Sequence, residues 1–376
     1  MKKITLLIGL FVIVQLGFTA LKAQQSGSII HDGVERTYIF FAAANPAEAQ
    51  PLLIAMHGYT QTAQGIMQYS QFNQLAESEG FAVVYPQGIG NSWNVDFSGG
   101  STADDVGFIE VLIDTLSAEY EIDTDRIYAT GFSNGGFMSY RLAYQLSNKI
   151  AAIAPVAGTV STTAFQNWTS EASVPLLHIH GTSDFVVPYN GFNGIESVET
   201  TLNYWIIKNG CVDDPVLINL PDMVQEGSTV EQYDWVECAS AKPIRLLKII
   251  NGGHTWPGSN GSGIGNVNMD ISASEMIWDF VKDFSLAEPV GLSSTFEPAW
   301  MFYPNPLYDN VLNLSDLPAD AVEFRLTNQL GNIVYVHTLT NLAAEVQIKI
   351  PQFSKGIYLL HLLTTDQIST KRIVIL

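Results

Sequence analysis

Short apolar runs alternate with amphipathic stretches along most of this chain. Apolar runs bounded by turn signals predict buried strands at residues 37–43, 52–56, 81–85, 127–129, 150–156, 176–179 and 244–250. Apolar residues recurring every three or four positions predict helices at residues 66–78, 105–116, 134–147 and 200–209, and a further helix that begins after Ser272. This alternation predicts a mostly parallel sheet with helices on both faces.

The pattern changes near residue 285. Residues 286–300 contain proline and serine without periodicity, which is typical of a linker. Beyond the linker, apolar and polar residues alternate as they do in half-buried strands, at residues 322–326, 346–350, 357–363 and 373–376. We therefore predict a doubly wound α/β domain over residues 24–285 and a small all-β sandwich over residues 301–376.

The first residues have the pattern of a secretory signal. Lys2 and Lys3 precede an apolar run over residues 4–18, and Ala23 offers a small residue for cleavage. The run is too short for a membrane span, although a retained N-terminal anchor is the alternative. No later segment is long and apolar enough to cross a bilayer. We predict a signal peptide over residues 1–23 and a secreted protein, extracellular or at the outer cell surface.

The charge balance limits the partners. Seventeen basic and 37 acidic residues give a formal net charge of −20, which repels nucleic acid and anionic lipid. Apolar residues make up 47% of the chain, enough for a sizeable core. We expect no nucleic-acid partner and no membrane span, whereas neutral or cationic substrates remain possible.

Only two cysteines occur, Cys211 and Cys238. In an oxidising compartment they are expected to form a disulfide that closes a loop of about 28 residues and stabilises the fold by about 3 kcal/mol. Two buried free thiols are the alternative. Without an adjacent histidine the pair does not form a structural zinc site.

One stretch carries a catalytic motif. Gly131-Phe132-Ser133-Asn134-Gly135 fits G-x-S-x-G, with a predicted strand before it and a predicted helix after it. Such a turn leaves a serine at its apex in strained geometry, and side chains two residues away on either side would collide. The motif predicts the nucleophile elbow of an α/β-hydrolase, with Ser133 as the nucleophile.

Two further strand ends supply the residues that such a serine needs. Asp184 follows the strand at 176–179, and His254 follows the strand at 244–250. Ligands of parallel sheets bind at the carboxyl ends of strands, and the order Ser, Asp, His is that of the α/β-hydrolase triad. We predict His254 as the general base and Asp184 as the acid that orients it.

The oxyanion requires two backbone N–H groups. One is expected from Asn134, just after the nucleophile, and the other from Tyr59, in the turn that follows the strand at 52–56. His57, in the same turn, is expected to shape this loop. The sequence shows no cofactor motif, and we expect none.

Several alternatives stay open at this point. Asp96, Asp104 or Asp105 could hold the histidine instead, although Asp105 is expected to cap its helix. His178 and His180 lie inside an apolar strand and are interpreted as core or supporting groups. A metal site formed by these two histidines and Asp184 is conceivable, but no H-E-x-x-H or comparable ligand helix supports it, and we expect no metal.

Several motifs occur together and carry a family resemblance. They are His57-Gly58-Tyr59-Thr60-Gln61, Ser92-Trp93-Asn94, Asp104-Asp105-Val106-Gly107-Phe108-Ile109, Gly131-Phe132-Ser133-Asn134-Gly135-Gly136 and Gly253-His254-Thr255-Trp256-Pro257-Gly258. Over residues 28–284 the chain resembles the secreted esterases that include polyhydroxybutyrate depolymerases, feruloyl esterases and acetylxylan esterases.

The resemblance implies that Ser133, Asp184 and His254 are catalytic and that Cys211 is paired. It also implies that Trp93, with its neighbour Asn94, and Trp256 flank the substrate cleft. Ordinary aromatic packing is the alternative for the tryptophans.

The last residues carry a second resemblance. Tyr303-Pro304-Asn305-Pro306, Gly331, Lys355-Gly356-Ile357-Tyr358 and Thr370-Lys371-Arg372-Ile373-Val374 resemble the C-terminal sorting domain of the type nine secretion system. This resemblance implies that the outer-membrane secretion machinery reads the domain, which can be removed afterwards. The alternative is a carbohydrate- or polyester-binding module, for which the strands offer mainly Tyr335 and Tyr358 as aromatic residues.

Together these features predict a secreted serine carboxylic-ester hydrolase that works through an acyl-enzyme. The expected substrates are polymer-linked esters, either feruloyl or acetyl esters of plant polysaccharide or a polyhydroxybutyrate-type polyester. A non-catalytic polysaccharide- or polyester-binding protein on a hydrolase scaffold is the alternative from a different class.

Overall fold

The computed structural model describes residues 24–375, except for residues 45–47, 98–99, 168–172, 213, 261–262, 288–299, 305–306, 308–309, 319, 329–332, 340–344 and 365–367. The chain divides into two compact units, residues 1–288 and 289–376. The predicted signal peptide and most of the predicted linker lie outside the described residues.

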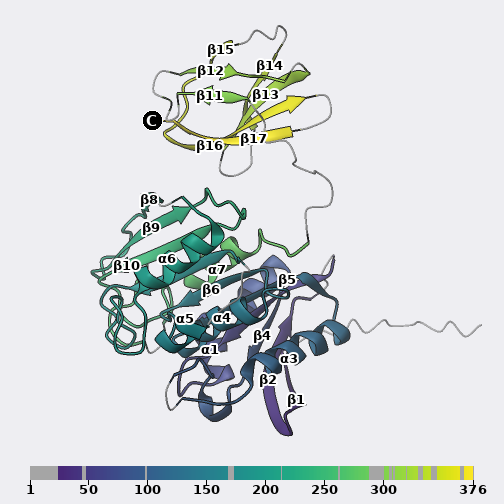
Figure 1. Ribbon diagram of the computed structural model, residues 1–376, viewed down its shortest axis with the longest axis vertical. Helices are drawn as coiled ribbons and strands as arrows, with labels where there is room; N and C mark the ends of the chain where they lie inside the picture. The colour runs from purple at the N-terminus through teal and green to yellow at the C-terminus, as the bar shows by residue number, and fades with distance from the viewer. Residues whose placement is uncertain are drawn as a thin grey trace, which may run out of the picture. The chain divides into compact units, whose positions relative to one another are not determined.

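The first unit is built on a ten-stranded sheet in the order β1-β2-β4-β3-β5-β6-β7-β10-β9-β8 (Figure 1). Its strands are β1 (Gln25–His31), β2 (Val34–Ala42), β3 (Gln50–Met56), β4 (Ala82–Pro86), β5 (Ile122–Phe132), β6 (Ala152–Val156), β7 (Leu176–Gly181), β8 (Val216–Asn219), β9 (Thr229–Trp235) and β10 (Ile244–Ile250). The six central strands, β4, β3, β5, β6, β7 and β10, pair with one another in parallel. On each side of them two strands are added in antiparallel pairing, β2 and β1 next to β4, and β9 and β8 next to β10.

Helices cover both faces of this sheet. They are α1 (Ala63–Ser70), α2 (Phe72–Glu79), α3 (Asp105–Glu119), α4 (Asn134–Gln145), α5 (Thr162–Asn167), α6 (Val198–Asn209) and α7 (Ala273–Val281), with a short 3₁₀ turn at Ile89–Asn91. One core contains residues of α3, α4 and α6, and the other contains residues of α1, α2 and α7.

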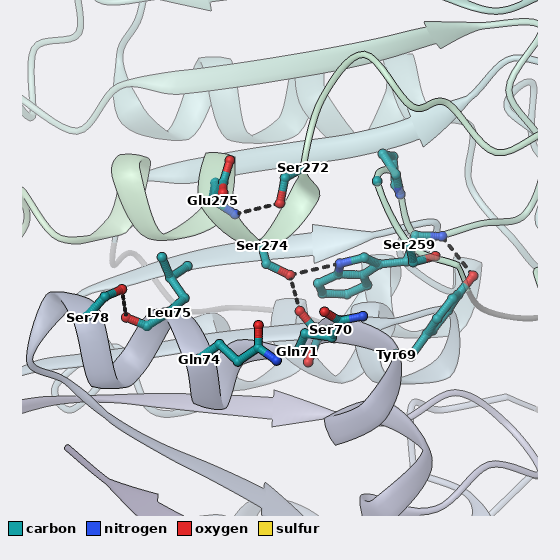
Figure 2. A pocket seen from close by; sticks show the side chains of 13 residues that line it. Tyr69, Ser70, Gln71, Gln74, Leu75, Ser78, Ser259, Ser272, Ser274 and Glu275 are labelled. Atoms are coloured by element: carbon teal, nitrogen blue, oxygen red, sulfur yellow. Dashed lines mark hydrogen bonds between the residues drawn. The ribbon is translucent and has the colours of Figure 1, made fainter. Parts of the chain in front are cut away.

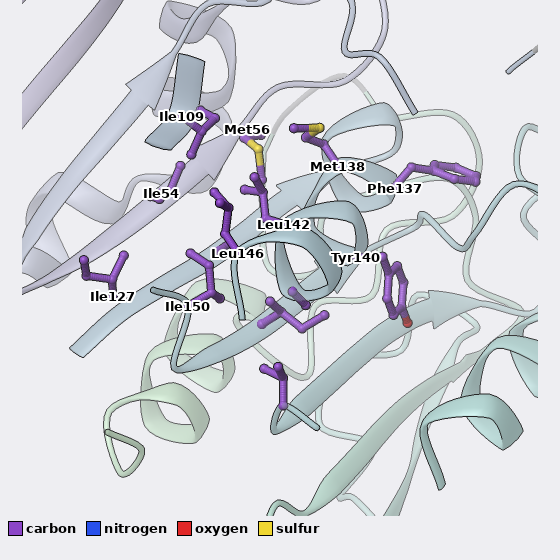
Figure 3. Packing of buried hydrophobic residues seen from close by; sticks show 14 of the residues in the cluster. Ile54, Met56, Ile109, Ile127, Phe137, Met138, Tyr140, Leu142, Leu146 and Ile150 are labelled. Carbon is purple, nitrogen blue, oxygen red and sulfur yellow. The ribbon is translucent and has the colours of Figure 1, made fainter. Parts of the chain in front are cut away.

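Side chains of the central strand β3 alternate between the two cores. Ile54 and Met56 pack in the first core and Leu53 and Ala55 in the second, as the period of two in a strand requires. Figure 3 shows the first two beside Leu142 of α4. The predicted α/β-hydrolase fold, with its doubly wound and mostly parallel sheet, is confirmed.

The predicted element order differs from the structure in several places. The helix predicted over residues 66–78 is two helices, because Gln71 adopts the left-handed conformation with φ of 55° and ends α1. The antiparallel strands β1, β8 and β9 were not predicted, and neither were helix α5 and strands β11, β12 and β14. An edge strand such as β1 buries little of either face, so its sequence lacks the apolar alternation on which the prediction depends.

The start of α3 also corrects the sequence interpretation. Asp104, not Asp105, caps the helix, and its side chain accepts the N–H of Gly107 at 3.1 Å. Asp105 is buried and pairs with Arg36 at 2.5 Å. Burial raises the pKa of Asp105, although the Asn94 N–H and the Arg36 guanidinium act against that shift. Asp105 therefore anchors the start of the helix to strand β2.

The predicted disulfide between Cys211 and Cys238 is present. Cys211 follows Gly210, whose left-handed conformation ends α6, and Cys238 follows β9. The bond ties the end of a helix to the antiparallel edge of the sheet.

The second unit has two antiparallel sheets around a core of its own, as the sequence predicts. One sheet has the order β11-β12-β15 and the other β14-β13-β16-β17. The strands are β11 (Met301–Tyr303), β12 (Val311–Ser315), β13 (Ala321–Thr327), β14 (Ile333–Thr338), β15 (Glu345–Lys349), β16 (Gly356–Thr364) and β17 (Ile368–Ile375). In neither unit do the described helices include one long and apolar enough to span a membrane.

The disulfide yields a stability prediction. Replacing both Cys211 and Cys238 with serine should lower the free energy of unfolding by about 3 kcal/mol, because the unfolded chain regains the entropy of the open loop. Urea unfolding of the mature chain measures this loss. As the control, a thiol reductant should destabilise the wild type and leave the double variant unchanged. Equal stability of the two proteins without reductant would contradict the prediction.

Candidate active site

Ser133 stands at the apex of the turn between β5 and α4. Its backbone has φ of 54° and ψ of −117°, a conformation that residues other than glycine rarely adopt. Its N–H donates to the Val156 carbonyl at 2.9 Å, and its own carbonyl accepts the N–H of Phe137 at 3.0 Å. The first bond to strand β6 and the second within α4 hold the strained residue in place.

Glycines allow the backbone segments around this turn to touch. A Cβ atom on Gly131 would lie 2.4 Å from the Gly135 carbonyl, and one on Gly135 would lie 2.2 Å from the Met56 carbonyl oxygen. Both glycines of the motif are therefore required on steric grounds, as the sequence predicts. Gly158 was missed: a Cβ there would lie 2.4 Å from the Ser133 carbonyl oxygen.

Asp184 and His254 meet beside this turn. Asp184 follows β7 and His254 follows β10, and these two strands are parallel neighbours. The Asp184 Oδ2 atom accepts the Nδ1–H of His254 at 2.7 Å, and both side chains are buried. This bond leaves the Nε2 lone pair of a neutral His254 available for another partner.

The surroundings of Asp184 favour its charged form. Burial alone would raise the pKa of this carboxyl group, but hydrogen bonds from His180 and His254, with the charge that either ring carries when protonated, outweigh burial and lower the pKa well below its usual range. The Oδ1 atom also accepts the backbone N–H groups of Val186 and Val187, each at 2.8 Å. Asp184 is thus a buried anion with most of its acceptor sites filled.

The other acids considered for this position lie elsewhere. Asp96 pairs with Arg141 at 3.5 Å, and Asp104 caps α3 while contacting His31 at 3.0 Å. Asp105 is paired with Arg36. Among these candidates, only Asp184 contacts His254 in the described part of the chain.

A pocket of about 280 Å³ opens over Ser133. Its lining residues are Gly58, Tyr59, Thr60, Gln61, Phe132, Ser133, Val186, His254, Gly263 and Ile264. Ser133 and His254 thus face the same space. Much of the remaining wall is apolar, and the exposed side chains of Tyr59, Val186 and Ile264 lie at its rim.

His57 shapes the turn that carries Tyr59. Its Nε2 atom accepts the N–H of Gly88 at 3.0 Å, so the ring proton lies on Nδ1 and donates to the Gly58 carbonyl at 2.8 Å. Burial lowers the pKa of His57 to about 4, so the ring is neutral at physiological pH. The Gly58 N–H donates to the side chain of Gln61 at 3.0 Å. These bonds fix the turn at the pocket wall.

The backbone and the side chain of Asn134 make separate contributions to the site. As the first residue of α4, its N–H belongs to the turn of helix that lacks intrahelical acceptors, directly after Ser133. Its side chain accepts the Trp93 N–H at 2.6 Å and donates to the Trp93 carbonyl at 3.3 Å. The side chain therefore holds the Trp93 loop, a role that sequence reasoning missed.

The three residues expected to contact substrate do not line the pocket at Ser133. Trp93 is 1% exposed, and its indole N–H donates to the His57 carbonyl at 2.9 Å. The Asn94 side chain donates to the Ala103 carbonyl at 2.9 Å. Instead of facing a substrate, Trp93 supports the turn of His57 from inside the protein.

Trp256 is also internal, at 1% exposure. Its indole N–H donates to the Ser274 hydroxyl at 3.1 Å. Trp256 and Ser274 both line a separate pocket of about 260 Å³, together with residues of α2 (Figure 2). The alternative reading of ordinary aromatic packing thus describes both tryptophans. The likeness of the motifs could not distinguish a buried indole from one at the cleft.

His178 and His180 are buried and bonded to one another. Tyr140 meets His178 Nδ1 at 2.7 Å, His178 Nε2 meets His180 Nδ1 at 3.2 Å, and His180 Nε2 meets the Val187 carbonyl at 2.8 Å. All four ring nitrogens have protein partners, so the two rings offer no free lone pairs to a common ion. His180 contacts Asp184 and the loop that follows it, so the two histidines are supporting groups, as interpreted from the sequence.

The chain is similar to known esterases and to a secretion domain. Residues 37–197 match the family Esterase PHB depolymerase, and residues 301–376 match the family Secretion system C-terminal sorting domain. The chain is 33% identical over 262 residues to a bifunctional acetylxylan esterase/xylanase of Neocallimastix patriciarum, covering 69% of this chain and 35% of that protein. It is 32% identical over 256 residues to feruloyl esterase B of Piromyces equi, covering 64% and 43%.

A third relative, poly(3-hydroxyalkanoate) depolymerase C of Paucimonas lemoignei, is 37% identical over 120 residues, covering 30% of this chain and 28% of that protein. The chain spans less than half of the length of all three relatives. In residues 37–197 the chain is thus similar to the PHB-depolymerase esterase family, and in residues 301–376 it is similar to secretion sorting domains. The sorting domain indicates an extracellular or cell-surface protein.

The backbone contacts at Ser133 yield a second prediction. Gly135→Ala should destabilise the protein by about 2–3 kcal/mol, because the new methyl group meets the Met56 carbonyl and the packed strand cannot yield. Gly65→Ala is the matched control: Gly65 is also helical, and a Cβ there would meet only Thr62 Oγ1, at 3.4 Å. That control should gain about 0.5–1 kcal/mol. Chemical denaturation of both variants is the measurement, and equal stabilities would refute the steric argument.

Proposed function

We propose that residues 24–285 form a secreted serine carboxylic-ester hydrolase that acts on polymer-linked esters. The observation that carries the proposal is the buried Asp184–His254 hydrogen bond at 2.7 Å beside a strained serine that faces the same pocket. The named esterases among the relatives support the same class of reaction.

In the proposed reaction Ser133 is the nucleophile. His254 Nε2 takes the proton of its hydroxyl while Oγ attacks the ester carbonyl, and then returns this proton to the departing alcohol. Asp184 holds the ring in the required tautomer and stabilises the imidazolium that forms. A water molecule, deprotonated by His254, then attacks the acyl-enzyme. This step releases the carboxylic acid product and restores the Ser133 hydroxyl.

The negative charge on the carbonyl oxygen needs donors that are already in place. We assign them to the backbone N–H groups of Asn134 and Tyr59, at the start of α4 and in the turn that His57 fixes. The neutral state of His57 suits this role, since only its neutral ring can accept the Gly88 N–H. Losing one such donor typically raises the barrier by about 3–4 kcal/mol.

The pocket limits the acyl group. Its volume of about 280 Å³ is near the lower end of pockets that hold drug-sized ligands. Apolar walls of that size suit a feruloyl or hydroxyalkanoyl group, and an acetyl group would leave much of the space unfilled. This argument favours the larger acyl groups among the ester classes that the relatives' names describe.

A binding protein on a hydrolase scaffold is the different-class alternative. Such a protein has no need of a strained serine at the pocket floor or of a buried anion that fixes a histidine tautomer. Both features cost stability, and both are retained here.

The proposal predicts that Ser133→Ala abolishes turnover. With a short-chain nitrophenyl ester, kcat should fall by at least about 10⁴-fold, because no other group can form the acyl-enzyme. Ser78→Ala is the control: Ser78 is exposed on α2 and lines the other pocket, so this variant should keep wild-type kcat. Unchanged turnover in the Ser133 variant would refute the mechanism. Methyl ferulate, acetylated xylan and hydroxybutyrate oligomers then rank the acyl groups.

We further propose that the C-terminal unit directs export through the type nine secretion machinery. Deleting residues 301–376 should retain the protein inside the outer membrane and leave esterase activity intact, because the proposed catalytic residues all lie in the first unit. Fractionation of cells of a host that carries this machinery is the measurement. Unchanged export with weaker binding to insoluble polymer would instead identify a binding module.

A further inference from the structure

A chain of buried side chains joins helix α4 to the loop of Asp184. Tyr140 lies on α4, the helix that begins after Ser133, whereas His178 and His180 lie on one face of β7, two residues apart. The links are 2.7 Å from Tyr140 to His178, 3.2 Å between the histidines and 2.8 Å from His180 to the Val187 carbonyl. Each of the three side chains is at most 1% exposed.

With both rings neutral, the partners fix the direction of every bond. The Val187 carbonyl can only accept, so the Nε2 atom of His180 carries a proton. The Nδ1 atom of a neutral His180 then accepts the Nε2–H of His178. The Nδ1 atom of His178 in turn accepts the Tyr140 hydroxyl. All donors therefore point from α4 toward the Asp184 loop.

The protonation states fit this direction. Burial raises the pKa of Tyr140 well above its ordinary value, so the phenol keeps its proton. Burial, followed by the charge of His180 when protonated, lowers the pKa of His178 well below its ordinary value. His178 is consequently a neutral ring that accepts on one side and donates on the other.

The chain ends on the residue that orients His254. The Nε2 atom of His180 lies 3.4 Å from Asp184 Oδ2, the oxygen that also accepts the Nδ1–H of His254. Val187 is held from both sides, its carbonyl by His180 and its N–H by Asp184 Oδ1. The Tyr189 ring packs edge-on against His180, and the Lys248 ammonium lies over that ring at 5.4 Å.

We propose that Tyr140, His178 and His180 are positioning residues. They fix the position of the Asp184 carboxylate relative to helix α4, which begins directly after Ser133. They do so through two neutral imidazoles that both carry their proton on Nε2. No covalent bond forms or breaks in this chain, and no proton needs to move along it. The effect on turnover rests on the proposed esterase function, whereas the hydrogen-bond chain itself does not.

The tautomers can be observed without any substrate. Nitrogen-15 spectra of the full mature chain, labelled at histidine, should show His178 and His180 near neutral pH with protonated Nε2 and bare Nδ1. His57 and His254 provide the internal reference, since their contacts require the opposite tautomer. A protonated Nδ1 on His178, or a cationic His180, would overturn the proposal. This result is independent of whether the protein turns over esters.

Kinetics of a His180 variant test the positioning role. His180→Leu should lower kcat about tenfold or more with KM nearly unchanged, because a misplaced catalytic group costs rate rather than binding. The acidic limb of the kcat/KM profile should move to higher pH, because the Asp184 carboxylate loses one of the donors that neutralise its charge. His180→Gln, whose amide can still donate to Val187, should restore both quantities in part.

A purely structural role would lower Tm and leave both kcat and the acidic limb at wild-type values, which would refute the proposal. If the His180→Leu variant does not fold, Tyr140→Phe, which removes a single oxygen, tests the same hydrogen-bond chain. It should alter the nitrogen signals of His178, because that ring loses its only donor to Nδ1. Unchanged signals and unchanged kcat in this variant would also refute the proposal. If the wild type itself hydrolyses no ester, the proposed function is wrong, but the nitrogen-15 spectra still test the hydrogen-bond chain from Tyr140 to His180.

Discussion

The contact between backbones around Ser133 is the constraint on which the rest of the site depends. Helix α4 begins so close to the end of β3 that a methyl group on Gly135 would collide with the carbonyls of both Met56 and His57. The nucleophile turn and the turn of Tyr59 therefore lie against each other with no side chain between them. Their separation is set by main-chain atoms, which vary far less than side-chain packing does.

Four buried histidines belong to the site and its support, and for three of them the proton position follows from a partner that cannot change its role. A backbone N–H forces one nitrogen of His57 to accept, and a backbone carbonyl forces one nitrogen of His180 to donate. The Asp184 carboxylate can only accept, so it forces the Nδ1 atom of His254 to carry the proton. Burial disfavours the charged form of Asp184, and neighbouring hydrogen-bond donors stabilise it. The site is thus organised before any substrate arrives, which is what preorganised catalysis requires.

Much of this arrangement could be predicted from the sequence. Strong local patterns predicted the central strands, the elbow and the disulfide, because buried parallel strands and a glycine-flanked serine leave few alternatives. The chain order of Ser133, Asp184 and His254 at strand ends predicted which side chains would come together. Asp104 and Asp105 show the limit: adjacent acids at a helix start look equivalent until Arg36, distant in sequence, selects one of them.

Other features depended on packing that no local pattern reports. Gln71 interrupts a helix whose apolar periodicity continues across it, and the two tryptophans of the family motifs turn inward to support loops. Tyr140 carried no signal at all, because a tyrosine on a buried helix face resembles ordinary core. Its hydroxyl gains a role only when β7 places His178 opposite it.

The separate cores of the two units have a consequence for thermodynamics. Among the described residues, the buried cluster of the second unit runs from Trp300 to Ile375 and shares no member with the clusters of the first. Each unit thus has a core of its own, and a two-state free energy of unfolding is a property of one unit and not of the whole chain.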